Sequence, residues 1–406
     1  MHLFRHIAQI FLDIRKYACK VSIQSDEKSV GAIRTQSLSG IALIVERSVM
    51  ENLLLAMSGG VDSSVALLLL REKYNVIGGT LKLHDSREND AGLCGSSQDI
   101  EDAKAIAERY GIPHYVFDMR ELFKSTVIKS FTDSYLNGRT PNPCVECNEQ
   151  IKFGALLDKA HELGCKYIAT GHYARVEYDA DRRRTLLKKA VFEDGSPNPK
   201  DQSYVLYRLN QEQLAAAVFP LGTMDKSRIR EIAGQNGLIN SHKPDSQDIC
   251  FVPDGDYGGF IEEYLGEPYH AGSFLDPDGN VIGSHKGVIY YTIGQRRGIG
   301  VGFGKPVYVI AKDAAHNTVT LGDNELLFTD TLYADNLNWI AFDNPDGEFR
   351  CKAKTRYKQT EQPCTVISDG GRVKVIFDDK IRAVTPGQHI VFYDGDTVLG
   401  GGVITG

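Results

Sequence analysis

The sequence predicts an α/β protein with a mostly parallel sheet, followed by a small mixed central domain and a C-terminal β-barrel. The first observation is that short apolar runs alternate with amphipathic segments between residues 52 and 172, which is typical of β-α units. The second is a change after residue 271 to short runs rich in β-branched and aromatic residues, separated by Gly, Asp and Pro. The length of the chain agrees with several domains, because 406 residues are more than one ordinary hydrophobic core accommodates.

The β-α units can be assigned in order along the chain. Apolar runs predict buried strands at 52–57, 75–83, 114–119 and 165–172. Helical spacing predicts helices at 63–73, 98–110, 121–138 and 149–164. Ser97 is the expected cap of the second helix and Gly111 its terminator. Since ligands bind beyond the carboxyl ends of parallel strands, segments 56–64 and 169–174 are expected to face one cleft.

Four regions follow from these patterns. We expect a catalytic domain at 50–255, a central domain at 256–331 and a barrel at 332–406, with a helical segment at about 217–238 that could pack with the central domain. Residues 1–49 are an extension of doubtful function, because Met50 directly precedes the first strand and an upstream start codon explains the extension best. Organellar targeting is the less favoured explanation.

Composition excludes several classes of protein. A net charge of −7 argues against a protein that coats nucleic acid non-specifically, although a local basic face remains compatible with it. No apolar run reaches the length of a membrane span, so no membrane partner is expected. Eight cysteines without a signal peptide indicate cytoplasmic thiols with catalytic or metal-binding roles more than a disulfide scaffold.

The stretch "AMSGGVDSS" at 56–64 lies between a predicted strand and a predicted helix. Successive backbone N–H groups, a helix N-terminus and serine hydroxyls bind phosphate oxygens. The lysine of a Walker loop is missing, so the loop suits a leaving pyrophosphate better than transfer of a γ-phosphoryl group. The sequence therefore favours adenylation over phosphorylation.

Three cysteines stand in segments that suggest chemistry. Cys144 and Cys147 form a C-x2-C in "GRTPNPCVECN", on a proline-restrained loop before a helix, where a thiolate is stabilised. Cys250 stands in "DSQDICF", a polar and turn-rich segment. The remaining cysteines have no motif and are predicted to be isolated thiols: Cys19, Cys94, Cys165, Cys351 and Cys364.

The loop resembles the N-type ATP pyrophosphatases, also called PP-loop proteins. Six further segments, in this order along the chain, resemble those of the tRNA-specific 2-thiouridylases of the MnmA type: "GRTPNPCVECN", "ATGHYAR", "KDQSYVLY", "FPLG", "DSQDICF" and "TIGQRRGIGVG". The resemblance covers essentially everything after Met50. It implies an adenine nucleotide alpha hydrolase-like domain, a central domain and a β-barrel. It also implies that sulfur replaces the C2 oxygen of the wobble uridine, and that ATP, bound with Mg²⁺, is consumed to AMP and pyrophosphate. The implied partners are the tRNA anticodon stem-loop and a sulfur donor such as a cysteine desulfurase or a sulfur relay protein.

The resemblance also implies roles for individual residues. Cys147 would be the nucleophile and Cys250 the carrier of the persulfide. The implied ATP-binding residues are Ala56, Met57, Ser58, Gly59, Gly60, Val61, Asp62, Ser63, Leu81 and Gly171. The implied tRNA-binding residues are Asn142, Pro143, Cys144, His172, Lys200, Asp201, Gln202, Arg356, Tyr357 and Gln388.

Several alternatives stay open at this point. Many family members have Asp where Cys144 stands, and Cys144, Cys147 and Cys250 could instead ligate three irons of a 4Fe–4S cluster whose fourth iron holds sulfide. His172 could support the base or only pack locally, and the basic run 181–189 could contact phosphates or form a solvated hairpin face. The alternative function is an amidating PP-loop ligase that acts on a small molecule, against which the cysteines and the barrel count.

Overall fold

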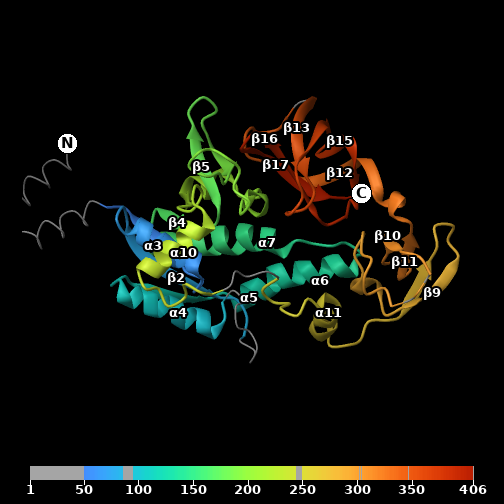
Figure 1. Ribbon diagram of the computed structural model, residues 1–406, viewed down its shortest axis with the longest axis horizontal. Helices are drawn as coiled ribbons and strands as arrows, with labels where there is room; N and C mark the ends of the chain where they lie inside the picture. Colours follow the sequence, from blue (N-terminus) through green and yellow to red (C-terminus); the bar gives the residue numbers. More distant parts are fainter. Residues whose placement is uncertain are drawn as a thin grey trace, which may run out of the picture. The chain divides into compact units, whose positions relative to one another are not determined.

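The first sheet is parallel in every described pairing, which confirms the predicted α/β fold (Figure 1). The computed structural model describes residues 50–85, 95–243, 249–300, 302, 304–345 and 347–405, so the predicted extension, Cys19 and Cys94 lie outside the described residues. The strands lie in the order β3 (His114–Asp118), β2 (Asn75–Lys82), β1 (Asn52–Ala56), β4 (Tyr167–Ala169) and β7 (Ala217–Val218). The two-residue strand β7 lies in a segment that the sequence predicts to be helical. Two residues carry no recognisable alternation, so this strand could not be predicted.

Alternate side chains of β1 face two apolar layers. Leu53 and Leu55 pack with three helices, which are α3 (Val61–Leu70), α4 (Ser97–Arg109) and α10 (Lys226–Gln235). Leu54 packs on the opposite face with η2 (Cys147–Ala155), a π-helical segment, and with α8 (Leu156–Glu162). Ile229 of α10 belongs to the first layer, so α10 lies on this domain and not on the central one.

The predicted start of α4 is wrong by one residue. The cap is Ser96, whose side chain accepts a hydrogen bond from the backbone N–H of Asp99 at 3.1 Å. Both Ser96 and Ser97 are acceptable caps, and only the backbone geometry separates them. The predicted terminator Gly111 is confirmed, with a φ of +64° that favours glycine.

A helical arm follows β3 and packs on the central domain. It consists of α5 (Arg120–Phe123), the π-helical η1 (Lys124–Ile128) and α6 (Lys129–Leu136), and the short α7 (Pro143–Glu146) then leads into η2. Phe123 and Phe131 of the arm pack edge to face on Phe251, in one apolar cluster with Ile261 of α11 (Tyr257–Leu265). The central sheet has the order β10 (Tyr308–Asp313), β11 (Thr318–Gly322), β8 (Gly272–Leu275) and β9 (Val281–His285).

One β-rich prediction in the central domain is wrong. The run "GVIYYT" forms the 3-10 helix η4 (Val288–Tyr290), and a second 3-10 helix, η5 (Asn324–Leu327), precedes the barrel. Gly287 has a φ of +140°, and its carbonyl accepts from the N–H of Tyr290 at 3.2 Å. This turn takes the backbone out of the extended conformation that the aromatic and β-branched residues predicted.

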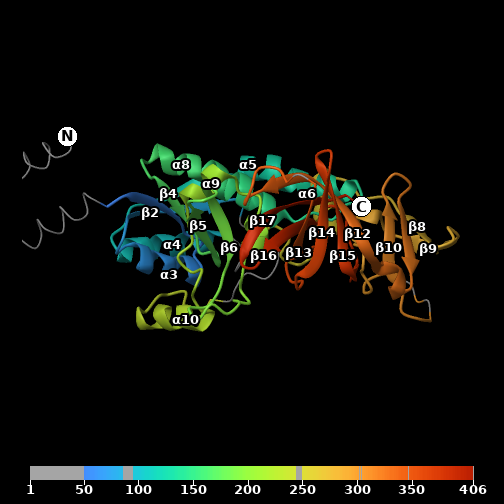
Figure 2. The same ribbon diagram turned by 90° about the horizontal axis from the view of Figure 1, so that it is seen from above.

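The C-terminal strands form a closed barrel (Figure 2). The order is β12 (Phe328–Trp339), β15 (Arg372–Arg382), β14 (Gln362–Asp369), β13 (Glu348–Lys354), β16 (His389–Asp394) and β17 (Thr397–Ile404), and β12 pairs with β17 to close it. β12 begins ahead of residue 332, the expected start of the barrel.

The barrel is joined to the first domain by a hairpin and a shared core. The hairpin β5 (Ala174–Asp179) and β6 (Arg184–Lys189) reaches β17 through the pair Lys188 and Thr397. Tyr204 and Tyr207, at η3 (Ser203–Leu206), lie in one apolar cluster with Val391 and Tyr393 of β16, and α9 (Gln211–Ala216) packs beside them. No helix of the described ranges is long and apolar enough to cross a membrane.

Candidate active site

The glycine-rich loop between β1 and α3 is tightly constrained. Ser63 Oγ accepts from the N–H of Ser58 at 3.2 Å and donates to the carbonyl of Gly60 at 3.0 Å. Gly60 caps α3 without a side-chain hydrogen bond, so the cap residue itself leaves the first amides of the helix uncovered. Gly59 has a φ of +69°, and a Cβ there would lie 2.4 Å from the carbonyl oxygen of Asp99. The loop therefore requires glycine at this position and presents backbone amides to a ligand.

The predicted ATP-binding residues gather around two cavities. A cavity of about 180 Å³ lies at the carboxyl ends of β1, β2 and β4. It is lined by seven of these residues, Ala56, Met57, Ser58, Asp62, Ser63, Leu81 and Gly171. Gly60 and Val61 line a second and larger cavity, and Gly59 packs against α4 instead. The residues Ser58, Asp62 and Gln202 line both cavities, so the two meet at the loop.

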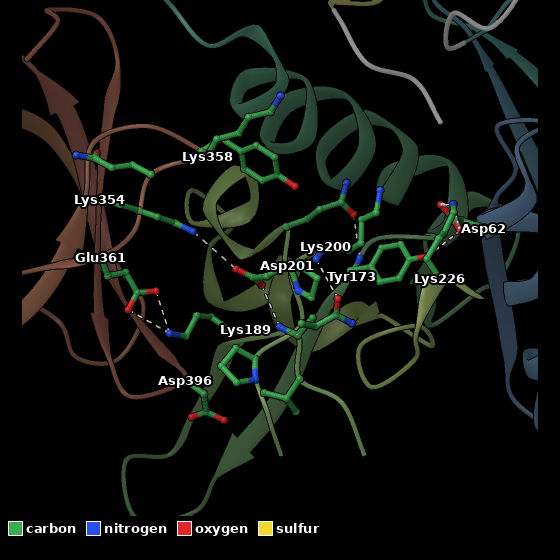
Figure 3. A pocket seen from close by; sticks show the side chains of 18 of the residues that line it. Asp62, Tyr173, Lys189, Lys200, Asp201, Lys226, Lys354, Lys358, Glu361 and Asp396 are labelled. Carbon is green, nitrogen blue, oxygen red and sulfur yellow. Dashed lines mark hydrogen bonds and ion pairs between the residues drawn. The ribbon is translucent and has the colours of Figure 1, made fainter. Parts of the chain in front are cut away.

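The larger cavity has a volume of about 1220 Å³ and extends from the loop to the barrel (Figure 3). We call it the lysine cavity, because lysines outnumber carboxylates among the described residues that line it. The lysines are Lys189, Lys200, Lys226, Lys243, Lys352, Lys354 and Lys358. The same lining holds five carboxylates, Asp62, Asp99, Asp201, Glu361 and Asp396, so its formal charge is positive and favours a polyanion even on a chain with a net charge of −7.

Lys226 is a residue of the site that the sequence did not reveal. Its Nζ lies 2.8 Å from each carboxylate oxygen of Asp62, and the hydroxyl of Tyr173 donates to Asp62 at 2.9 Å (Figure 3). Asp225 caps α10 by accepting from the N–H of Ser227, which places Lys226 in the first turn. The only local signal is this cap, and nothing in the sequence connects α10 with a loop so far away along the chain. A lysine thus reaches the loop from another helix.

The segment after α10 also holds the loop in place. The amide of Asn240 donates to the carbonyl of Gly59 at 2.8 Å and to Ser64 Oγ at 2.9 Å. Lys243 forms an ion pair with Asp99, at the start of α4. The glycine-rich loop, α4 and the segment after α10 are therefore held together by hydrogen bonds and an ion pair.

Of the predicted tRNA-binding residues, Lys200, Asp201, Gln202 and Tyr357 line the lysine cavity. Asp201 is half-buried and accepts from the N–H groups of Ala190 at 2.9 Å and Ser203 at 3.1 Å, with Lys354 Nζ at 3.9 Å. Burial raises the pKa of Asp201 and lowers the pKa of Lys354. Gln202 accepts from the N–H of Tyr173 at 2.9 Å, so Asp201 and Gln202 fix the wall of the cavity.

Arg356 and Gln388 make contacts within the chain. Arg356 Nη2 donates to the carbonyls of Ile293 at 3.2 Å and Ala383 at 3.1 Å, and to Thr385 Oγ1 at 2.8 Å. Burial lowers its pKa. Gln388 Nε2 donates to the carbonyls of Thr140 at 2.9 Å and Pro141 at 3.1 Å. Gln388 thus fixes the loop that leads directly into Asn142 and Pro143.

His172 lines the small cavity and is buried. Its Nδ1 lies 2.7 Å from Thr170 Oγ1, and its ring contacts those of Phe153 and Phe219. Burial, with a smaller effect from Lys152, lowers the pKa of His172 well below its ordinary value. The imidazole is therefore neutral at physiological pH.

The three candidate cysteines differ in exposure. Cys144 is exposed in the short α7, next to the half-buried Asn142 and the buried Pro143. Cys147 is buried at the first position of the π-helical η2, and Cys250 is half-buried. Cys147 belongs to the apolar cluster around Phe131 and Phe251, against which Cys250 packs. Cys147 and Cys250 therefore share one apolar environment, which Cys144 does not enter.

The cysteines do not form a ligand set for a metal cluster. In the described part of the chain, which includes all three thiols, no group of three or more His, Cys, Asp and Glu side chains is placed to hold a metal ion. The conformation described here therefore does not fit a 4Fe–4S cluster on Cys144, Cys147 and Cys250.

The basic run at 181–189 forms the turn after β5 and the whole of β6. Lys188 pairs with Glu177 at 2.7 Å, Lys189 pairs with Glu361 at 2.9 Å, and Arg184 pairs with Asp343. Only Lys189 among these three faces the lysine cavity. Much of the positive charge of the hairpin is thus balanced by carboxylates of the chain.

A phosphate-gripping loop at the carboxyl edge of a parallel sheet, without a Walker lysine, defines a nucleotide-activating enzyme of the PP-loop type. The matching family models are described as the tRNA methyl transferase HUP domain over residues 51–254, the tRNA methyl transferase PRC-barrel domain over 258–323 and the aminomethyltransferase beta-barrel domain over 329–404.

The chain belongs to the family of the tRNA-specific 2-thiouridylases MnmA. It is similar to the tRNA-specific 2-thiouridylase MnmA of Clostridioides difficile, at 47% identity over 87% of this chain and 98% of that protein. The MnmA of Acetivibrio thermocellus is 46% identical over 87% of this chain and 99% of that protein. These relatives do not favour the amidating-ligase alternative.

Among solved structures, the U34-tRNA thiolase NcsA of Methanococcus maripaludis, with its [4Fe-4S] cluster, matches at a TM-score of 0.31 and 18% identity, over 54% of this chain and 68% of that chain. This likeness is too low to bear on the cysteines.

Proposed function

We propose that the protein replaces the C2 oxygen of the wobble uridine of tRNA with sulfur, in a reaction that consumes ATP. The observation that carries the proposal is that the PP-loop opens into the lysine cavity at Ser58 and Asp62. A nucleotide on the loop and a polyanion along the lysines can therefore meet at one place. Membership of the 2-thiouridylase family supports this substrate.

The first step activates the uracil carbonyl. The C2 oxygen attacks the α-phosphorus of ATP, its bond to phosphorus forms, and pyrophosphate leaves with the electrons of the broken P–O bond. The amides of the loop and the hydroxyl of Ser58 grip the pyrophosphate, which arrives with Mg²⁺, and Ser63 holds the loop in shape through Ser58 and Gly60. Leu81 and Gly171 lie on the adenine side. We assign to Lys226 the positive charge that a Walker lysine would supply, because its Nζ is held at the loop by Asp62.

The lysine cavity is the proposed place of the anticodon stem-loop. Lys200, Lys352 and Lys358 lie along it and can contact phosphates, whereas Tyr357 offers a ring on which an unstacked base can lie. Burial, with smaller effects from Asp201 and Cys144, raises the pKa of Tyr357 to about 12, so the ring stays neutral. Arg356 and Gln388 act as positioning residues, since their donors bind acceptors of the chain.

The second step transfers sulfur. A donor protein, such as a cysteine desulfurase or a sulfur relay protein, leaves a persulfide on Cys250. Its terminal sulfur attacks C2, and AMP leaves with the former carbonyl oxygen. The Cys147 thiolate then attacks the Cys250 sulfur, which forms a disulfide between them and releases the thiocarbonyl of the product. The shared apolar environment of Cys147 and Cys250 supports this pairing.

A thiol reductant must reopen that disulfide before the next cycle. Such reductants are abundant in the cytoplasm, which is the proposed location. No step passes through an iron–sulfur cluster, because no group of three or more His, Cys, Asp and Glu side chains is placed to hold a metal ion in the described part of the chain.

The test is a reaction of purified protein with tRNA, ATP and a persulfide-loaded cysteine desulfurase, followed by nucleoside mass spectrometry. The expected products are 2-thiouridine and AMP in equal amounts. Cys147→Ala should make no 2-thiouridine, whereas the matched control Cys165→Ala, which changes a buried thiol of another apolar cluster, should retain activity. AMP formation without any thiouridine in the wild-type protein would overturn the proposal.

A further inference from the structure

Two cysteines of the barrel, far from the candidate active-site thiols in the chain, face each other. Cys351 of β13 and Cys364 of β14 are directly opposite in the antiparallel register, and their sulfur atoms lie 3.7 Å apart. The expectation that each is an isolated thiol is wrong. It fails because the sequence separates them by a hairpin whose register only the fold determines.

The two cysteines of the pair differ in how far they are buried. Cys364 is fully buried in the barrel core with Val366 and Val375, whereas Cys351 is only partly buried. Cys351 is therefore the more accessible residue of the pair. Directly opposite residues of antiparallel strands have Cα atoms about 4.5–5.5 Å apart, within the range that a disulfide spans.

We propose that Cys351 and Cys364 are a redox modification site that forms a reversible cross-strand disulfide. The oxidant is a low-molecular-weight disulfide of the glutathione type. The Cys351 thiolate attacks one of its sulfurs, forms a mixed disulfide and releases one thiol. Cys364 then attacks the Cys351 sulfur and releases the second thiol, so two protein thiols are oxidised and one small disulfide is reduced to two thiols.

The hairpin that the disulfide closes is part of the lysine cavity. Between the two cysteines lie Lys352, Lys354 and the connecting residues Tyr357 to Glu361, all of which line it. The contact with Cys364, together with burial, raises the pKa of the Cys351 thiol. Because the thiolate is the attacking form, the reaction should quicken as the pH rises above neutrality.

The test exposes the full-length protein to glutathione disulfide at pH 8, blocks the remaining thiols by alkylation and maps peptides by mass spectrometry. The expected result is a linked Cys351–Cys364 peptide that a dithiol reductant removes, and an upward shift of the thermal midpoint that reverses with it. A Cys147→Ala/Cys250→Ala background should keep both, because it removes only the other expected disulfide.

Cys351→Ser should abolish the link and the shift, and it avoids the fully buried position of Cys364. The proposal is overturned if both barrel thiols are recovered alkylated, or only as mixed disulfides with glutathione, under conditions that link Cys147 with Cys250.

Discussion

Changing Lys226 to methionine removes the cation that contacts both carboxylate oxygens of Asp62 at 2.8 Å. Only 13% of the Lys226 side chain and 28% of the Asp62 side chain are exposed, so solvent replaces the contact poorly. A hydrogen bond to a charged group contributes about 1.5–3 kcal/mol. If Lys226 makes one such contact to the departing pyrophosphate, its loss slows adenylation about 10- to 150-fold.

The assay is pyrophosphate release at saturating ATP and tRNA, alongside thermal unfolding and tRNA affinity. Arg228→Met is the matched control, since it removes a positive charge from the same helix, where Arg228 pairs with Glu231 at the surface. We expect Arg228→Met to release pyrophosphate at the wild-type rate. A folded Lys226→Met protein that also does so would refute the role assigned to Lys226.

Four further predictions follow from single contacts. Gly59→Ala should abolish ATP binding, measured by calorimetry, because the new Cβ would lie 2.4 Å from the carbonyl oxygen of Asp99; binding of normal strength would contradict the described loop. Arg356→Ala should lower the thermal midpoint and leave the salt dependence of tRNA affinity unchanged, whereas a shallower slope would indicate a phosphate contact. Burial lowers the pKa of His389 to about 3, so the folded state holds it neutral while the unfolded chain binds a proton below about pH 6.5. As the pH drops from about 6.5 to about 3, the free energy of unfolding should therefore fall by up to about 1.4 kcal/mol for each pH unit. Urea unfolding of His389→Gln should show a smaller fall over the same range. Cys144→Asp should thiolate tRNA after anaerobic purification without iron, and an inactive variant that has lost bound iron and sulfide would favour a cluster.

The parts of the fold that could be predicted are those with local patterns. The alternation of apolar runs and helical spacing gave the parallel sheet, because each strand and helix carries its own periodicity. β7 has two residues and no periodicity, and η4 has the composition of a strand but the hydrogen bond of a turn. Local composition decides neither case.

The residues of the site also fall into those that a local pattern predicts and those that only the fold reveals. The loop at 56–64 could be recognised because its chemistry lies within one short segment. Lys226 and Gln388 contact partners far away along the chain, and these partners depend on how sheet, helix and barrel pack. Cys351 and Cys364 are close in the chain, but their contact depends on the register of one hairpin. For Arg356, the sequence suggests only a residue type suited to RNA, and the contacts of its Nη2 with carbonyls inside the chain become visible only in the fold.

The central claim is that ATP activates the C2 oxygen itself before sulfur arrives, and an isotope label tests it most directly. A tRNA whose wobble uridine carries ¹⁸O at C2 is thiolated with unlabelled ATP, and the released AMP is analysed by mass spectrometry. The account predicts one ¹⁸O atom in each AMP for each 2-thiouridine formed, because the carbonyl oxygen leaves bonded to the α-phosphorus. Unlabelled AMP, with the ¹⁸O recovered in water or pyrophosphate, would contradict it.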